Sequence, residues 1–208
     1  MTRRIAVRTV GSLIVALMTV ATLLAQVLPS QFSADMKTTG RGMSSTGKLY
    51  FGGPKVRMDI ASQGHQSIMI TDTQRKVSYM LMPDQHMYME MSTAMQGAKR
   101  SPDWRVYDPA HPCANVPDTT CERLGPGIAD GRLCDKWKFS NSKRASSQTT
   151  WIDQKTGIPI RTETSDGTVM ELTNIKEGAQ SASLFEIPSG YTKMDMGAMM
   201  QGAQGRNK

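Results

Sequence analysis

A two-residue alternation of apolar and polar side chains runs through residues 55–91 and constrains the fold more than any other feature. Val56, Met58 and Ile60 alternate with charged residues, and residues 76–91 repeat the pattern with methionine, leucine and tyrosine. Side chains that recur with period two lie on one face of a half-buried strand. The chain is therefore predicted to form an antiparallel sheet of short, consecutive strands.

Turn sequences separate the predicted strands. Gly52-Gly53-Pro54 and Pro83-Asp84-Gln85 are typical of tight connections. Asp130-Gly131 is a strong signal for a two-residue hairpin loop between residues 121–128 and 132–139. Further strands are predicted over residues 147–153, 158–165 and 168–176. The pattern indicates about ten strands in two runs, a mainly β class and one strongly curved sheet.

The segment between the two runs is predicted to be different. Ser92 to Lys99 suits one or two helical turns, with Ser92 as the N-cap. Residues 101–118 hold four prolines and are expected to form an ordered, Pro-rich excursion. Because no flexible linker divides the runs, residues 26–193 are predicted to be one domain. Residues 194–208 are rich in Met, Gly and Gln and are expected to form a mobile tail.

The N-terminus resembles a secretory signal peptide. Three arginines within the first eight residues precede an uncharged, apolar stretch from Val10 to Leu24. We predict cleavage after Ala25, so that residues 1–25 are the signal and the domain is periplasmic. The alternative is an uncleaved inner-membrane tether, because Val10 to Leu28 is long enough to cross a bilayer. No cysteine precedes Cys113, so a lipobox is absent.

Charge and motifs argue against several classes of function. Without residues 1–25 the chain has 22 basic and 18 acidic residues, a balance of +4 that is spread along the sequence and does not favour a nucleic-acid partner. GxSxG and glycine-rich phosphate loops are absent, and the carboxylates are dispersed. His65, His86 and His111 show no metal-ligand spacing. We therefore predict neither an enzyme nor a cofactor.

The three cysteines allow three pairings in an oxidising compartment. If Asp130-Gly131 is a two-residue turn, Cys134 lies opposite Gly127 and several positions along the ladder from Cys121. That separation disfavours a bond between Cys121 and Cys134, because bridged Cα atoms lie within about 7 Å. A bond between Cys113 and Cys121 closes a short loop and is preferred. Cys134 is then expected to be a free, small, buried residue.

The chain has 17 methionines, and many of them cluster. Those at positions 80, 82, 87, 89 and 91 lie on two neighbouring predicted strands. Methionine at such positions is typical of an adaptable apolar surface, which is the favoured interpretation. The alternative is a thioether site for Cu(I) or Ag(I). The weak candidates for such a metal site lie in the tail, at Met194, Met196, Met199 and Met200.

Four stretches carry a resemblance to a known family. They are SIMITDTQRKVSYMLMPDQHMYMEM, CERLGPGIADGRLCDKWKF, TTWIDQKTGIPIRTET and ELTNIKEGAQSASLFEIPSGYTKMDM. Together they resemble an uncharacterised periplasmic family, a domain of unknown function, within the superfamily of the lipoprotein carriers LolA and LolB. The resemblance implies an incomplete antiparallel β-barrel, a short helical lid and an apolar cavity on the concave side.

The resulting hypothesis is a non-catalytic binding module for an apolar ligand, either a lipid or a lipoprotein acyl chain. The alternatives are a Met-rich envelope protein that binds Cu(I) or Ag(I), and a structural protein that docks an envelope protein partner. Contact with the membrane is expected only if the signal is uncleaved. The residues predicted to line the cavity are Val56, Met58, Ile60, Ile68, Ile70, Met87, Met89, Met91, Trp137 and Trp151.

Overall fold

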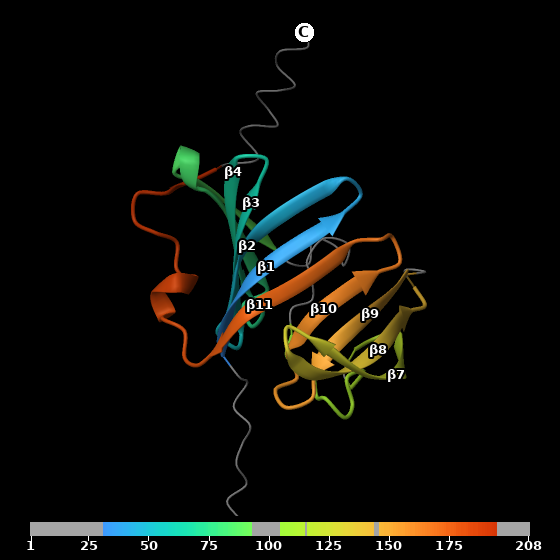
Figure 1. The fold of residues 1–208 in the computed structure, drawn as a ribbon. Coiled ribbons are helices and arrows are strands. Elements are labelled where there is room, and N and C mark those ends of the chain that lie inside the picture. The colour runs from blue at the N-terminus through green and yellow to red at the C-terminus, as the bar shows by residue number, and fades with distance from the viewer. Residues whose placement is uncertain (1–30, 93–104, 115, 144–145, 195–208) are drawn as a thin grey trace, which may run out of the picture.

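A computed structural model describes residues 31–92, 105–114, 116–143 and 146–194, which form one twelve-stranded sheet (Figure 1). The sheet is curved and does not close, so the predicted mainly β class and single curved antiparallel sheet are confirmed. The strands are β1 (Phe32–Gly40), β2 (Met43–Phe51), β3 (Lys55–Ser62), β4 (His65–Asp72), β5 (Val77–Met82), β6 (Met87–Ser92), β7 (Thr119–Ala129), β8 (Arg132–Asn141), β9 (Ser146–Asp153), β10 (Pro159–Thr164), β11 (Val169–Glu177) and β12 (Thr192–Lys193). Two 3-10 turns, η1 (Pro83–Gln85) and η2 (Ala182–Phe185), complete the described elements.

The two predicted runs join through the first and eleventh strands. The spatial order is β12-β6-β5-β4-β3-β2-β1-β11-β10-β9-β8-β7. Every neighbouring pair is antiparallel except β12 and β6, which are parallel over two residues. Strand β1 was not predicted from the sequence, although Phe32, Ala34 and Met36 alternate there and are buried. Its pairing with β11 joins segments about 140 residues apart in the chain.

Two-residue turns fix the register of three hairpins. Asp130 and Gly131 have φ angles of 47° and 68°, and Ala129 pairs with Arg132, as the Asp-Gly signal predicted. Gln63-Gly64 forms the same kind of connection between β3 and β4, and Arg41-Gly42 forms it between β1 and β2. Positive φ at both loop positions is the geometry of a type I′ turn, whose twist matches that of the strands.

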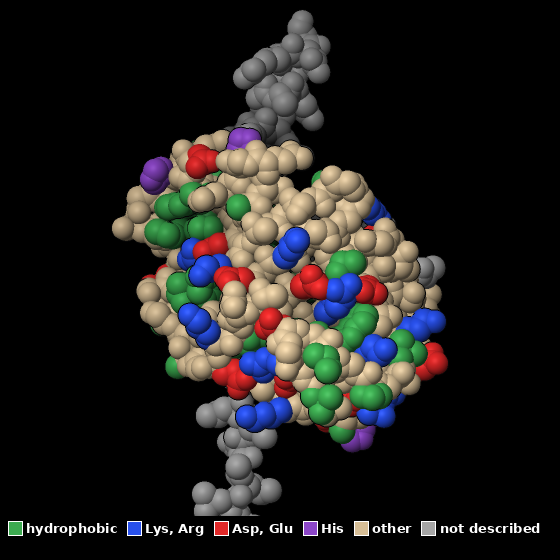
Figure 2. Space-filling model, viewed as in Figure 1, with side chains coloured by type: hydrophobic (Ala, Val, Ile, Leu, Met, Phe, Trp, Pro, Cys, Tyr) green, Lys and Arg blue, Asp and Glu red, His purple; other side chains and the backbone are tan. Residues whose placement is uncertain are grey.

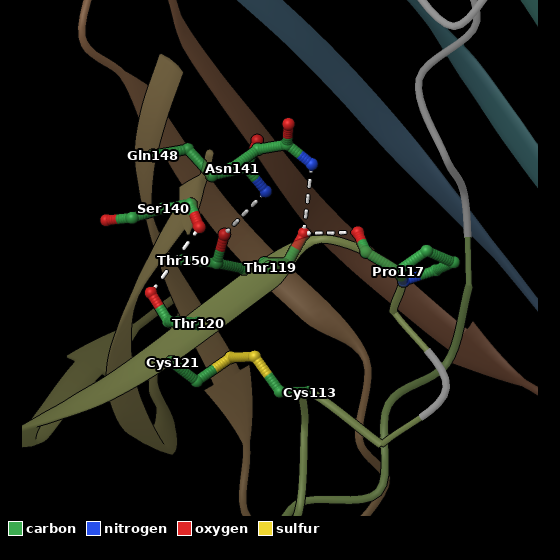
Figure 3. Close-up of a disulfide and its surroundings, with 9 residues drawn as sticks. All are labelled: Cys113, Pro117, Thr119, Thr120, Cys121, Ser140, Asn141, Gln148 and Thr150. Atoms are coloured by element: carbon green, nitrogen blue, oxygen red, sulfur yellow. Dashed lines mark hydrogen bonds between the residues drawn. A yellow bond between two sulfur atoms is a disulfide. The ribbon is translucent and has the colours of Figure 1, made fainter. Parts of the chain in front are cut away.

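The disulfide lies where the Pro-rich excursion meets the sheet. Cys113 is bonded to Cys121 on β7, with Cα atoms 5.8 Å apart (Figure 3). Beside it, Thr119 donates to the carbonyl of Pro117 and accepts from the amide of Asn141. Cys134 is a free cysteine and is fully buried opposite Gly127, and burial raises the pKa of its thiol to about 11.

The turn between β9 and β10 fastens the described part of the excursion to the sheet. The Asp153 carboxylate accepts from the backbone of Lys155 and from the backbone and hydroxyl of Thr156. Burial alone would raise the pKa of Asp153, but these hydrogen bonds and one from Arg132 lower it. Gly157 has a φ of 72°, and a Cβ there would lie 2.0 Å from the carbonyl oxygen of Tyr107. Glycine is therefore required at this contact.

Several expectations fall outside the described residues. They are the signal peptide (1–25), the helix after Ser92, residues 101–104 and 115 of the excursion, and the tail after Met194. Ser92 itself ends β6. Within the described ranges, no helix has the length and apolarity needed to span a membrane.

Candidate binding face

Strands β1–β6 have two faces with different chemistry, and the ladders that join these strands contain no register shift. Met58 pairs with Met69, Met69 with Met80, and Met80 with Met89. Directly paired side chains have Cβ atoms about 4.5–5.5 Å apart, so the four thioethers form a continuous row across four strands. We call this surface the methionine face, and its methionines are Met36, Met43, Met58, Met69, Met80, Met82, Met87, Met89 and Met91, of which Met43 lies apart from the others at the far end of β2.

Burial of the methionines on this face decreases from the centre of the sheet toward its edge, although Ser78 of β5, which forms a hydrogen bond with Thr71, is fully buried there. Met36 and Met58 are buried and belong to the larger core cluster, together with Leu49, Phe32 and Leu172. The six methionines on β4, β5 and β6 are only half-buried. Methionine is unbranched and flexible, and it is common at surfaces that adapt to varied apolar partners. This edge of the face is thus an apolar surface of adaptable shape.

The opposite surface, which we call the tyrosine face, carries Tyr50, Tyr79 and Tyr88. The chain's own C-terminal segment packs on it: Phe185 of η2 contacts Ile70 and Leu81 in a second core cluster. Figure 1 shows η2 as the orange turn at the left, beside the strands. The Arg57 guanidinium donates to the carbonyl of Leu184 at 3.0 Å and also pairs with Asp59. Packing and directional hydrogen bonds therefore hold the segment in place.

The ten residues predicted to line one cavity lie on both faces of the sheet. Val56, Met58, Ile60, Met87, Met89 and Met91 share the methionine face. The placement of Ile68 and Ile70 with them was wrong, because Ile70 pairs with Arg57 and lies on the tyrosine face. The cause is the Gln63-Gly64 turn, which pairs even-numbered residues of β3 with odd-numbered residues of β4.

The two predicted tryptophans also separate. Trp137 pairs with Thr150, so Trp137 and Trp151 lie on opposite faces of the sheet, and the expectation that they share a cavity was wrong. Trp151 lies under the Arg161 guanidinium, which is 5.5 Å from the centroid of its ring. The Nε1 of Trp137 is buried without a hydrogen-bond partner among the described residues. A ligand oxygen at that position would satisfy the indole N–H.

A surface hollow of about 460 Å³ opens near Gly47, mostly on the tyrosine face. A Cβ at Gly47 would lie 1.9 Å from the carbonyl oxygen of Asp59, so the close approach of β2 and β3 requires glycine at this position. Asp35, Lys37 and Lys48 contribute charged groups to its walls. Of the predicted cavity residues, this hollow includes only Ile60 and Ile68. It is open and charged, unlike the apolar cavity expected from the sequence.

The weak metal candidates of the tail are mostly outside the described part. Met194 is its last residue, and the other three tail methionines lie beyond it. In the portion of the chain that the structure describes, no three His, Cys, Asp or Glu side chains are grouped to hold a metal ion. The row of thioethers on β3–β6 was a stronger signal than the tail. The clustering of methionines at positions 80–91 predicts part of this row, but no local pattern adds Met69 or gives the register that joins it to Met58 and Met80.

Comparison with known proteins identifies a family and a shared fold. A family model described as a domain of unknown function (DUF4412) matches residues 33–155, more than half of the chain. This match agrees with the resemblance found in the sequence. No curated protein matches the chain.

Solved structures are similar at low identity. An uncharacterized conserved protein from Thermus thermophilus has 12% identity and a TM-score of 0.55, over 80% of this chain and 91% of that one. MucB, from Pseudomonas aeruginosa, has 13% identity and a TM-score of 0.51, over 77% of this chain and 58% of MucB. A LolA superfamily protein from Nitrosomonas europaea has 10% identity and a TM-score of 0.37, over 76% of this chain and 89% of that one. The first two show a common fold.

Proposed function

The chain belongs to the DUF4412 family, and from that premise we propose that it is an exported, non-catalytic binding module whose methionine face holds a lipid or an acyl chain. The observation that carries the proposal is the row of paired thioethers on β3–β6, of which Met69, Met80 and Met89 are half-buried. An acyl chain on this surface would remove further apolar area from water, which stabilises the complex by about 25 cal/mol per Å².

Two features support export to the cell envelope. The uncharged N-terminal stretch behind three arginines has the composition of a secretory signal. The disulfide between Cys113 and Cys121 fits an oxidising compartment such as the periplasm. Export would give the methionine face access to envelope lipids.

The first test is recovery of a natural ligand. Protein purified from the envelope is analysed by native mass spectrometry and by extraction into organic solvent. We expect a bound apolar species that leaves on extraction, and displacement of a fluorescent fatty acid by that extract. Repeated recovery of protein without any apolar species, together with no fatty-acid binding, would contradict the proposal.

A matched pair of variants locates the ligand. Met80→Gln with Met89→Gln places amides on the methionine face, and we expect fatty-acid affinity to fall about tenfold, equivalent to about 1.4 kcal/mol. Met43→Gln is the control, because Met43 lies on the same face but is exposed at the far end of β1 and β2, away from the row of paired thioethers. Equal affinity in both variants would exclude the row of paired thioethers as the ligand site.

The same row of thioethers favours a second candidate function, the binding of Cu(I) or Ag(I). Soft thioether ligands suit these ions, and paired methionines bring several sulfurs close together. Anaerobic titration with Ag(I) tests it, with Met58, Met69 and Met80 replaced singly by leucine. Leucine retains apolar volume but has no sulfur, so a loss of Ag(I) binding with fatty-acid binding retained would favour the metal.

A third candidate is an envelope protein partner. MucB has been solved in complex with MucA, and MucB shares the fold of this chain. Crosslinking in cells followed by purification would show whether a protein of the envelope is retained. A stoichiometric protein partner without any bound lipid would favour this alternative over the carrier.

A further inference from the structure

The β7–β8 hairpin exposes apolar side chains in a way that the rest of the described chain does not. Only four large hydrophobic residues are exposed among those described, and three of them, Leu124, Ile128 and Leu133, belong to this hairpin. Figure 2 shows hydrophobic side chains gathered at the lower right, over β7 and β8. Exposed apolar groups concentrated on one element indicate an interaction surface.

The two most exposed of these three residues form a rigid pair at the tip of the hairpin. Ile128 is 74% exposed and Leu133 is 58% exposed, and they pair directly across the strands. The next pair, Ala129 and Arg132, closes the type I′ turn. Backbone pairing on both strands holds the two aliphatic side chains side by side, so they are available to a partner without prior ordering.

The tip lies at the end of the sheet where the N-terminal part of the chain enters. Arg132 forms an ion pair with Glu177 at 3.0 Å, and Glu177 pairs with Phe32, the first residue of β1. The backbone N–H of Gly178 donates to the carbonyl of Gln31. The exposed aliphatic pair is thus beside the point at which residue 31 joins the fold.

The sequence before this point is the most apolar of the chain. Residues 9–34 carry no charge, and about 20 apolar residues suffice to cross a bilayer. In the form of the chain that keeps this stretch as an inner-membrane tether, the stretch ends next to β1, so the membrane that receives it lies close to the Ile128–Leu133 tip. In that tethered form, the length and chemistry of the preceding segment select a lipid bilayer as the partner of the tip.

We propose that the β7–β8 tip docks on the surface of a lipid bilayer by burying Ile128 and Leu133, and that this orients the N-terminal end of the sheet toward the membrane. The interaction is apolar in origin, since Asp130 lies in the turn and Arg123 is paired with Asp135. Docking should therefore be insensitive to salt, unlike binding driven by surface charge. The inference applies to the chain that keeps its N-terminal stretch, and it does not depend on which ligand the methionine face holds.

The test places an environment-sensitive fluorophore at each end of the sheet in the full-length chain. Ile128→Cys and Met43→Cys are labelled with a thiol-reactive nitrobenzoxadiazole probe under non-reducing conditions. Cys134 is fully buried and the other two cysteines are bonded, so labelling is selective. Met43 is the matched control because it is also exposed but lies at the opposite end of β1 and β2.

Each labelled protein is reconstituted into vesicles of phosphatidylethanolamine and phosphatidylglycerol. At position 128 we expect emission to shift to shorter wavelength, to rise severalfold and to be quenched by doxyl-labelled lipid, at low and high salt alike. At position 43 we expect none of these changes. A water-like spectrum at position 128 on vesicles that carry the protein would overturn the proposal.

A second variant distinguishes the contribution of the tip to membrane binding from that of the N-terminal segment. Leu133→Asp, introduced into the protein labelled at position 128, should abolish the shift while the chain stays on the vesicles. Leu133 is exposed, so the fold should survive the change, and a thermal melt monitored by circular dichroism verifies this. Persistence of the shift in this variant would show that the aliphatic pair does not anchor the domain.

Discussion

The two faces of strands β2–β6 are covered in different ways. On the tyrosine face, Phe185 packs on Ile70 and Leu81, and Arg57 fixes the carbonyl of Leu184 with a directional hydrogen bond. On the methionine face, the methionines of β4, β5 and β6, which have no strong hydrogen-bonding groups, stay half-buried. One face is therefore specified by the chain's own contacts, and the other has an adaptable surface. Substitutions on the tyrosine face should therefore change mainly the stability of the fold, and substitutions on the methionine face should change mainly ligand binding.

The largest expected effect on stability comes from a substitution on the tyrosine face. Phe185→Ala removes a buried ring between Ile70 and Leu81, and we expect the free energy of unfolding to fall by about 3 kcal/mol. Urea denaturation followed by tyrosine fluorescence measures the loss. Fatty-acid affinity of the protein that remains folded should be unchanged, because the ring lies on the tyrosine face. A loss of affinity with little loss of stability would reverse the proposed roles of the two faces.

A smaller effect is expected when the directional contact is removed. Arg57→Met keeps most of the apolar stem but removes the donors to Leu184 and Asp59, and we expect a loss of about 1–2 kcal/mol. Hydrogen exchange should increase in residues 182–193. Arg161→Met is the control, since Arg161 also pairs with acidic side chains, those of Glu163 and Glu171, and these lie on β10 and β11. Faster exchange of the segment in both variants would exclude a specific role for Arg57.

A still smaller change in stability is expected when thioethers are replaced by branched side chains. Met69→Leu, Met80→Leu and Met89→Leu conserve volume, and each should change the free energy of unfolding by less than about 1.5 kcal/mol. Because leucine has fewer rotatable bonds, the triple variant should bind a narrower range of acyl-chain lengths than the original protein. Competition with fatty acids of increasing length measures this range, and an unchanged range would contradict an adaptable surface.

The smallest effect is expected at the edge of the tyrosine face. A hydrogen bond with Glu90 raises the pKa of Lys193. A raised lysine pKa stabilises the fold below the unfolded-state pKa, and this contribution is lost as the pH rises through the folded-state value. The pair is exposed, so Glu90→Gln should lower the melting temperature only slightly at pH 7 and not at all at strongly alkaline pH. A large change at pH 7 would show that β12 is held mainly by this charge pair.

The sequence predicted local features well because each rests on adjacent residues. The alternation at Val56, Met58 and Ile60 indicated a strand, and Asp130-Gly131 indicated a two-residue turn. That turn also placed Cys134 opposite Gly127 and disfavoured its pairing with Cys121, and the structure pairs Cys121 with Cys113.

The rest depends on contacts that the sequence does not encode locally. Ile68 and Ile70 suit either face, and only the register set at Gln63-Gly64 places them on the tyrosine face. The pairing of β1 with β11 joins distant segments, and no local pattern predicts it. The assignment of candidate residues to a cavity was the weakest prediction for this reason, since a shift of one residue moves a side chain to the other face.

The most direct test of the central claim is paramagnetic broadening of methionine methyl signals. Protein with ¹³C-labelled methionine methyl groups is titrated with stearate that carries a doxyl group near its end. Ligand on the row of paired thioethers should broaden the signals of Met69, Met80 and Met89 at low stearate concentration and leave Met43, which is exposed at the far end of β2, sharp. Equal broadening at Met43, or none at Met69, Met80 and Met89 while stearate binds, would contradict the account.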